Sequence, residues 1–147
     1  MGFFVEVVDP ARTRALRRAV LRPALRPEDS LPGDDIPDAV HIGALDDFHA
    51  VLGTCFVYPT PFPWPVELPA PQWRLRAMAT AADRRGQGIG RAVLQGAHDY
   101  VVGAGGRSLW CHARETAVGF YAANGWRAEG DLFVENGLPH RAMWTAL

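Results

Sequence analysis

The stretch Arg85-Gly86-Gln87-Gly88-Ile89-Gly90 follows a strand-like run at residues 73–80 and opens a helix-like run that continues to about residue 104. Three glycines in five positions let backbone amides approach a ligand without interference from Cβ atoms. Amides at the start of a helix lack intrahelical partners and lie at the positive end of its dipole, which suits a phosphate or pyrophosphate. The turn therefore predicts an anion-binding site between a strand and a helix.

Two common phosphate-binding motifs do not fit this turn. A dinucleotide fingerprint, GxGxxG, needs a glycine where the chain has Arg91. A nucleoside-triphosphate loop, GxxxxGK(S/T), fails at the same place, because Arg91 is followed by Ala92 rather than by lysine. The pattern that the chain does fill is Arg/Gln-x-x-Gly-x-Gly/Ala, with Arg85, Gly88 and Gly90.

A second segment lies downstream, where Phe120-Tyr121 is followed by Gly125-Trp126. Together with the glycine turn, it resembles the acetyl-CoA-binding motif and the motif that follows it in the GNAT superfamily of N-acetyltransferases. The resemblance covers residues 74–126 well and extends to the last strand pair through residues 137–143. Earlier in the chain it is limited to the order of the elements.

Hydrophobic periodicity predicts one mixed α/β domain over residues 1–147, with no internal repeat and no linker. The expected helices cover residues 11–21, 89–104 and 116–123, and the expected strands cover residues 3–8, 39–45, 50–58, 73–80, 107–113, 126–134 and 140–146. In the first helix, Leu16, Val20 and Leu21 lie on one side and the arginines surround the rest. The resemblance implies a single mixed, mostly antiparallel central sheet flanked by helices, which is the GNAT-like acyl-CoA N-acyltransferase fold.

Bulk composition narrows the class of protein. At 147 residues, with 48% hydrophobic and 21% charged residues, the chain has the composition of one soluble globular domain. Its net charge of -1 gives no basis for a nucleic-acid partner, and no apolar run is long enough to span a membrane. We expect a cytoplasmic protein whose two cysteines, Cys55 and Cys111, are reduced and buried. The basic residues are all arginines, since lysine is absent.

The resemblance implies acetyl-CoA as the cofactor and assigns residues to it. The end of the strand, Met78-Ala79-Thr80, would bind the pantetheine arm through backbone groups. Arg91 would add a charge-assisted contact. The amides of the glycine turn would wrap the pyrophosphate, at Arg85, Gly86, Gln87, Gly88, Ile89 and Gly90. No metal is implied, because no cluster of histidine, cysteine and acidic residues has ligand spacing.

Tyr121 is the expected catalytic residue. In the family, the tyrosine at this place often acts as the general acid for the departing thiolate. A neutral phenol can protonate the sulfur of coenzyme A, since both groups ionise above neutral pH. The alternative is a structural role in which Tyr121 only packs against the cofactor. The chain departs from the family at Arg114, where an asparagine that contacts the cofactor is common.

The general base and the acceptor stay open at this level. An ammonium acceptor needs a carboxylate, a histidine or a relayed water to take its proton. The candidates are His41, His49, His112, Glu115, Glu135 and His140. Acids in the turns could attract a cationic amine, namely Glu28, Asp29, Asp34, Asp35, Asp46 and Asp47. Phe62 and Trp64 could instead form an apolar pocket.

The proline-rich residues 59–71 fit three interpretations: a rigid surface connection, a wall of the substrate site or a ligand for a proline-binding partner.

We therefore predict an N-acetyltransferase that transfers an acetyl group from acetyl-CoA to an amine by direct attack, with a backbone amide near Ala79 polarising the thioester carbonyl. The alternative is a non-catalytic acyl-CoA-binding sensor or scaffold module. The expected partner is a small-molecule or peptide amine, with neither nucleic acid nor membrane. Exposed edge strands would also allow a homodimer.

Overall fold

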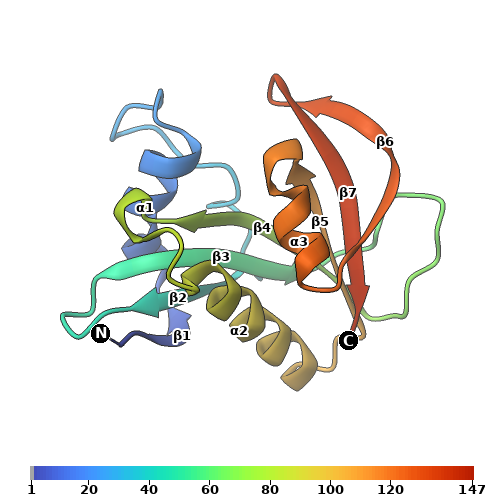
Figure 1. Ribbon diagram of the computed structural model, residues 1–147, viewed down its shortest axis with the longest axis horizontal. Helices are drawn as coiled ribbons and strands as arrows, with labels where there is room; N and C mark the ends of the chain where they lie inside the picture. The colour runs from blue at the N-terminus through green and yellow to red at the C-terminus, as the bar shows by residue number, and fades with distance from the viewer. Residues whose placement is uncertain (1) are drawn as a thin grey trace.

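A computed structural model describes residues 2–147 (Figure 1). Along the chain, the elements are β1 (Phe4–Val8), α1 (Pro10–Leu21), β2 (Val40–Leu45), β3 (Val51–Pro59), β4 (Gln72–Thr80), the 3-10 helix η1 (Ala82–Arg84), α2 (Ile89–Gly103), β5 (Ser108–Arg114), the 3-10 helix η2 (Glu115–Ala117), α3 (Val118–Ala123), β6 (Arg127–Glu135) and β7 (Leu138–Ala146). The helices and strands predicted from the sequence are all present, and their ends differ from the prediction by a few residues.

The strands form one sheet in the order β1-β2-β3-β4-β5-β7-β6. Neighbouring strands run antiparallel, except that β4 and β5 run parallel. The prediction of a mixed, mostly antiparallel sheet is therefore confirmed. Helices α1 and α2 both pack against β2, β3 and β4, and they do so from opposite faces of the sheet (Figure 1).

Helix α2 covers its face of the sheet with apolar side chains, as its sequence periodicity predicts. They share one core cluster with Val57 of β3 and Leu75 of β4. Gly53 allows the helix to approach the sheet closely, because a Cβ there would lie 2.6 Å from Cγ2 of Ile89. Burial of one such aliphatic side chain contributes about 1.5–3 kcal/mol to folding. The buried residues of the helix are Ile89, Val93, Leu94, Ala97 and Val101.

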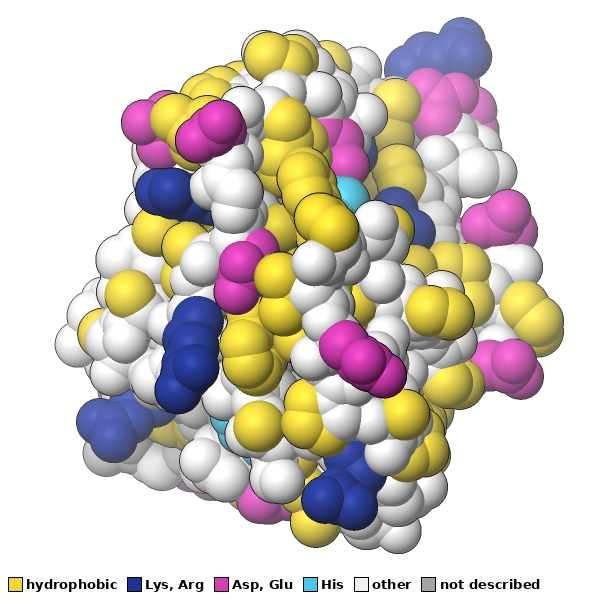
Figure 2. All heavy atoms as spheres, turned by 90° about the vertical axis from the view of Figure 1, so that its right-hand side faces the viewer, with side chains coloured by type: hydrophobic (Ala, Val, Ile, Leu, Met, Phe, Trp, Pro, Cys, Tyr) yellow, Lys and Arg dark blue, Asp and Glu magenta, His cyan; other side chains and the backbone are white. Residues whose placement is uncertain are grey.

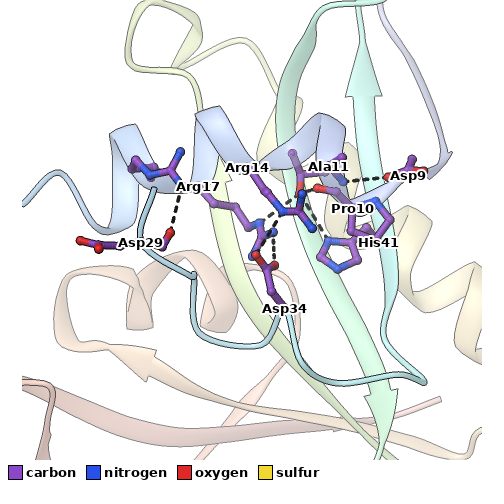
Figure 3. Close-up of polar contacts among 10 residues, drawn as sticks. Asp9, Pro10, Ala11, Arg14, Arg17, Asp29, Asp34 and His41 are labelled. Carbon is purple, nitrogen blue, oxygen red and sulfur yellow. Dashed lines mark hydrogen bonds and ion pairs between the residues drawn. The ribbon is translucent and has the colours of Figure 1, made fainter. Parts of the chain in front are cut away.

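Helix α1 packs differently, because its most buried residues are polar. Thr13 is 0% and Arg17 is 2% exposed. Arg17 Nη2 lies 2.5 Å from Asp34 Oδ1, and Arg14 Nε lies 3.1 Å from Asp34 Oδ2 (Figure 3). The expectation that the arginines surround the outside of this helix is therefore wrong for Arg17, since the following loop supplies a carboxylate that compensates its buried charge. The ion pair also fastens that loop to the helix.

The protonation state of Asp34 follows from these contacts. Burial raises the pKa of the Asp34 carboxyl, but the hydrogen bonds and charges of Arg17 and Arg14 outweigh this effect, so the pKa lies below its ordinary value. Asp34 is consequently ionised at neutral pH and keeps the pair intact.

The proline-rich segment 59–71 packs onto the sheet beside β5. Phe62 and Leu68 form a second core cluster with Trp110 and Ala142. Trp110 Nε1 donates to the Thr60 carbonyl at 3.0 Å. The segment is thus a packed surface connection, in agreement with the first of its three sequence-based interpretations.

Strand β6 forms an exposed edge of the sheet. Figure 2 shows the side of the molecule that carries β6 and β7, where apolar side chains form a broken band among scattered charges. On β6, Leu132 is 49% and Val134 is 76% exposed. An exposed apolar edge strand can pair with another chain, and the homodimer stays a prediction.

Candidate active site

Strands β4 and β5 lie side by side only at their beginnings. Their parallel pairing ends at Arg74 and Trp110, although β4 continues to Thr80 and β5 to Arg114. Beyond that point the strands diverge, since β4 stays with β3 and β5 stays with β7 (Figure 1). A cavity of about 850 Å³ lies in this fork, and residues from both faces of the sheet line it. The end of β4, to which the resemblance assigns the pantetheine arm, therefore lies apart from β5 and lines a cavity.

A β-bulge shapes the β4 side of the fork. Ala77 and Met78 of β4 together oppose the single residue Cys55 of β3. Ala77 has a φ of 57°, a left-handed conformation that costs roughly 1–2 kcal/mol for a residue with a Cβ. Residues 77–80 all line the cavity. Ala79 is only 3% exposed, so it offers a ligand little beyond its backbone.

The glycine turn adjoins the same cavity through Arg85 and Gly90. Gly86 and Gly88 have φ values of 81° and 80°, and no atom lies within 4 Å of the position that a Cβ would take at either residue. The first hydrogen bond of α2 joins the Ala92 amide to the Gly88 carbonyl at 3.1 Å. The amides at the start of the helix therefore have no intrahelical partners and can bind an anion.

Tyr121 reaches the cavity from α3, on the face of the sheet that α2 covers. Its side chain is 4% exposed and packs beside Phe120 and Trp126, with ring centroids 5.2 and 5.0 Å away. Burial raises the pKa of the Tyr121 hydroxyl well above its ordinary value, and the adjacent Cys111 adds to this. Tyr121 is thus a neutral phenol that can donate a proton. Cys111 and Cys55 are both buried and free, which confirms the prediction for the cysteines.

His112 and Glu135 form a polar pair on the opposite face. His112 Nδ1 lies 2.9 Å from Glu135 Oε2, and His112 Nε2 accepts from Trp64 Nε1 at 3.2 Å. Glu135 is the last residue of β6, directly before the turn Asn136-Gly137, whose positive φ values are those of a two-residue hairpin. Since both ring nitrogens of His112 are engaged, Glu135 has the greater capacity to accept a further proton or hydrogen bond.

Burial keeps His112 neutral, and neighbouring groups keep Glu135 ionised. Burial lowers the pKa of His112; the hydrogen bond to Glu135 opposes this, and the nearby Arg74 guanidinium reinforces it. Burial alone would raise the pKa of Glu135, but the hydrogen bond from His112 and the charge of Arg74 outweigh it, so the pKa is lowered. A neutral imidazole therefore donates from Nδ1 to a carboxylate at neutral pH.

The structure brings only part of the predicted site to the cavity. Among the predicted residues, those in the lining are Met78, Ala79, Thr80, Arg85, Gly90 and Tyr121. Gly86, Gln87, Gly88 and Arg91 are exposed on the turn or the first turn of α2, outside that lining. Ile89 is 1% exposed with its side chain in the core, so it can offer a ligand only its backbone. The individual binding roles stay predictions.

The candidates for the general base separate clearly. Those in the lining are His112, Glu135 and His140. His41 lies outside it, beneath α1, where its Nδ1 is 3.5 Å from the Thr13 hydroxyl (Figure 3). His49 and Glu115 are exposed residues that do not line the cavity.

The acidic turns do not supply the cavity with negative charge. None of Glu28, Asp29, Asp34, Asp35, Asp46 and Asp47 belongs to its lining. Asp34 binds the arginines of α1, and Asp29 accepts from Arg26 at 3.2 Å. Attraction of a cationic amine by these acids therefore has no support in the fold.

Sequence reasoning missed the arginines of β4 and the contact of Trp64. Arg74 and Arg76 alternate with the buried residues Trp73 and Leu75, so both guanidinium groups belong to one face of an interior strand. That alternation was a usable signal. The bond from Trp64 to His112 joins residues that are distant in sequence, and no local pattern predicts it.

The described part of the chain lacks both a candidate metal site and a helix that could cross a membrane. Residues 2–147 contain no group of three or more histidine, cysteine or acidic residues that could hold a metal ion. No helix in that range has the length and apolar character needed to cross a membrane.

The chain is similar to acetyltransferases both in sequence and in structure. Residues 66–147 match the family model described as the acetyltransferase (GNAT) domain. The uncharacterized N-acetyltransferase YitI of Bacillus subtilis is 28% identical over 145 residues, which cover 97% of this chain and 95% of YitI. A candidate N-acetyltransferase of Lactobacillus plantarum superimposes with a TM-score of 0.82 at 21% identity, covering 100% of this chain and 99% of that one. An aminoglycoside 6'-N-acetyltransferase solved with coenzyme A has a TM-score of 0.76 at 13% identity, with 97% and 96% covered.

The chain belongs to the GNAT acetyltransferase family. The matched residues contain β4, the glycine turn, Tyr121 and the His112–Glu135 pair, so the family match and most of the cavity coincide. The structural neighbours extend the same fold over the N-terminal residues, including α1.

Proposed function

We propose that the protein transfers an acetyl group from acetyl-CoA to the amine of a small-molecule or peptide acceptor. The observation that carries the proposal is the cavity in the fork, which has Tyr121 on one face of the sheet and Glu135 on the other. A proton donor and a proton acceptor thereby lie on two sides of one space, as acyl transfer to an ammonium requires. Membership of the GNAT family and the coenzyme A bound by the aminoglycoside 6'-N-acetyltransferase support the same reaction.

The chain offers groups that fit each part of the cofactor. The glycine turn has open space where Cβ atoms would stand at Gly86 and Gly88, and its amides would hold the pyrophosphate. Arg85 and Arg91 would add positive charge. The backbone beyond the bulge at Ala77 would bind the pantetheine arm, at the place where β4 has left β5.

Acetyl-CoA would supply the activated thioester, and residues of the protein would accept and donate the protons. Glu135 would take one proton from the acceptor ammonium, with His112 holding the carboxylate in place. The acceptor nitrogen would then bond to the acetyl carbon while the carbon–sulfur bond breaks. An amide near Ala79 would polarise the carbonyl oxygen. Tyr121 would protonate the departing sulfur, and the second proton of the nitrogen would restore the phenol.

Calorimetric titration tests the cofactor assignment. We expect acetyl-CoA to bind, and NAD and ATP not to bind. Gly88→Glu should abolish binding, because it combines a strained left-handed backbone with a negative charge where the pyrophosphate would lie. Gly105→Glu, just beyond the other end of α2, has a φ of 89° and open space, so it is the matched control and should bind normally. Failure of the parent protein to bind acetyl-CoA would refute the proposal.

Thiol release from acetyl-CoA with a panel of amines tests catalysis. Tyr121→Phe should slow release about a hundredfold or more, with acetyl-CoA affinity almost unchanged. Tyr100→Phe is the control, because that tyrosine packs on Trp73 outside the cavity. Full activity of Tyr121→Phe would leave Tyr121 with a packing role only. Acetyl-CoA binding by the parent protein without thiol release would favour the sensor or scaffold alternative.

A further inference from the structure

The part of the cavity on the face of Glu135 is lined by arginines. Glu135 is the only acid in the lining among residues 2–147. Arg17 also reaches the lining, but Asp34 neutralises it. Arg85 belongs to the glycine turn. The arginines that remain on the Glu135 side are Arg22, Arg74, Arg76 and Arg114. This part of the cavity is therefore positively charged, with a single carboxylate among several guanidinium groups.

None of these four guanidinium groups forms an ion pair within residues 2–147, and uncharged groups orient three of them. Arg74 lies 4.8 Å over the Trp110 ring, and its Nε is buried without a hydrogen-bond partner. Arg76 lies 5.6 Å over the Phe56 ring. The Arg114 side chain donates to a backbone carbonyl at 3.1 Å. Aromatic faces and a carbonyl orient these groups without neutralising them, so their capacity to bind an anion is retained.

Strand geometry gathers the groups around the fork. Arg74 and Arg76 lie two residues apart on β4, and His112 and Arg114 lie two residues apart on β5, so each pair shares one face. Arg74 Nη2 lies 3.3 Å from His112 Nδ1, which places Arg74 close to the pair with Glu135 across the fork. Since Nδ1 donates to Glu135 and a guanidinium can only donate, this is a close approach and not a hydrogen bond. Positive groups thus adjoin the single carboxylate without being paired to it.

Apart from Arg22, a further part of the lining is apolar, and we call it the α1 wall. It comes from the end of α1 and from the loop that Asp34 fastens to it. The apolar residues of this wall are Val20, Leu21, Pro23, Leu25, Leu31 and Pro32. A polyamine or another multiply charged cation would meet several unpaired arginines and an apolar surface here, which is unfavourable.

We propose that the acceptor is an apolar amino acid or a similarly small amine that carries an anionic group. Its ammonium would lie against Glu135, its carboxylate against Arg74, Arg76 and Arg114, and its apolar side chain against the α1 wall. Two opposite charges placed on one small molecule match the one acid and the several arginines of the cavity. The inference rests on the proposed acetyl transfer and adds the class of its acceptor.

Paired substrates test this inference by thiol release from acetyl-CoA. Phenylalanine, leucine and tryptophan are each compared with the amine that lacks the carboxylate, and spermidine serves as the cationic comparison. We expect kcat/KM to be about tenfold or more higher for each amino acid than for its decarboxylated amine. O-phosphoethanolamine against ethanolamine shows whether phosphate replaces carboxylate as the anionic group; the same arginine dependence with phosphate would support the inference with that group.

Arginine variants show whether the preference arises in this cavity. Arg76→Gln and Arg114→Gln should each raise KM for the amino acid about tenfold, while KM for acetyl-CoA and for the decarboxylated amine stay unchanged. Arg107→Gln, an exposed arginine outside the lining, is the matched control. Circular dichroism and acetyl-CoA titration confirm that each variant is folded.

The possible results distinguish a failure of this inference about the acceptor from a failure of the proposed acetyl transfer. Equal or better use of spermidine or of the decarboxylated amines would overturn the inference and leave acetyl transfer standing. Acetyl-CoA binding with no release from any amine carrying an anionic group would overturn it as well. Loss of the carboxylate preference in Arg76→Gln and Arg114→Gln, but not in Arg107→Gln, is the result that supports it.

Discussion

Helices α1 and α2 pack against the same three strands from opposite faces, but they do so with different chemistry. Helix α2 buries a continuous apolar face, whereas α1 buries Thr13 and Arg17. The core on the α2 side is built mainly from apolar side chains, and such cores tolerate substitutions that conserve volume. The α1 side depends on a few oriented polar contacts, so the contribution of a residue there to stability depends on whether its partner is present. The charged part of the cavity lies on this second side.

The largest expected effect on the α1 side follows from removing the partner of Arg17. Asp34→Ala should lower the free energy of unfolding by about 3 kcal/mol, because it leaves a guanidinium that is 2% exposed without its carboxylate. Urea unfolding at neutral pH measures this. Asp29→Ala is the control: its partner Arg26 is 74% exposed, so the loss should stay below about 1 kcal/mol. Equal losses would mean that the buried pair is no more important than a surface pair.

A double variant sharpens the comparison between the two helices. Arg17→Met combined with Asp34→Ala removes both charges and gives α1 an apolar contact like those of α2. Replacement of a buried pair by apolar groups is often neutral or stabilising, so the double variant should recover most of the stability lost in Asp34→Ala. A double variant as unstable as Asp34→Ala would show that the loop needs this carboxylate for another reason.

His41 should make the α1 side sensitive to acid. Burial and the Arg17 charge lower the pKa of His41 from 6.5 to about 4, although Asp34 opposes this. Because the unfolded chain takes up the proton first as pH falls, stability is full above about pH 6.5 and falls between there and about pH 4. Between about pH 7.5 and about pH 5 this amounts to about 2 kcal/mol. His41→Gln should lose correspondingly less stability over that interval in urea unfolding; an unchanged slope would contradict the assignment.

A smaller effect is expected where the proline-rich segment supports His112. Trp64→Phe keeps an aromatic ring against Phe133 but removes the hydrogen-bond donor to His112 Nε2. Loss of a donor that favours the neutral ring should raise the pKa of His112. We expect kcat to fall by up to about tenfold and the acidic limb of the pH profile to move to higher pH, with KM for acetyl-CoA unchanged.

Trp144→Phe is the matched control for that measurement, because its indole donates to Glu129 at 2.9 Å and lies outside the cavity lining. It should leave the pH profile in place. An identical profile for both variants would remove Trp64 from any part in positioning His112.

The same difference between the two faces explains which features the sequence could predict. The helix at residues 89–104 was predictable, because its apolar period is local and because the glycine turn before it has a specific pattern. The burial of Arg17 was not, since its partner Asp34 comes from another segment and only the folded chain shows that they meet. The bulge at Ala77 carries no local signature either, because alanine has no preference for positive φ.

Some residues of the candidate site could likewise be predicted from a local pattern, and others could not. Tyr121 and the residues of the glycine turn are predicted from a motif, which needs no knowledge of three-dimensional contacts. The pairing of His112 with Glu135 and Trp64 joins three separate segments, so the sequence could offer only a set of candidate bases. Geometry reduced that set to the groups in the cavity.

The fork between β4 and β5 has a consequence for the order of kinetic events. Because residues from both faces of the sheet line the cavity, we expect the two reactants to approach it from opposite faces. Neither reactant would then block the path of the other, and both would have to be present together for transfer. Double-reciprocal plots at several fixed concentrations of the second reactant should accordingly intersect, whereas a shared entrance with an acylated enzyme between two half-reactions would give parallel lines.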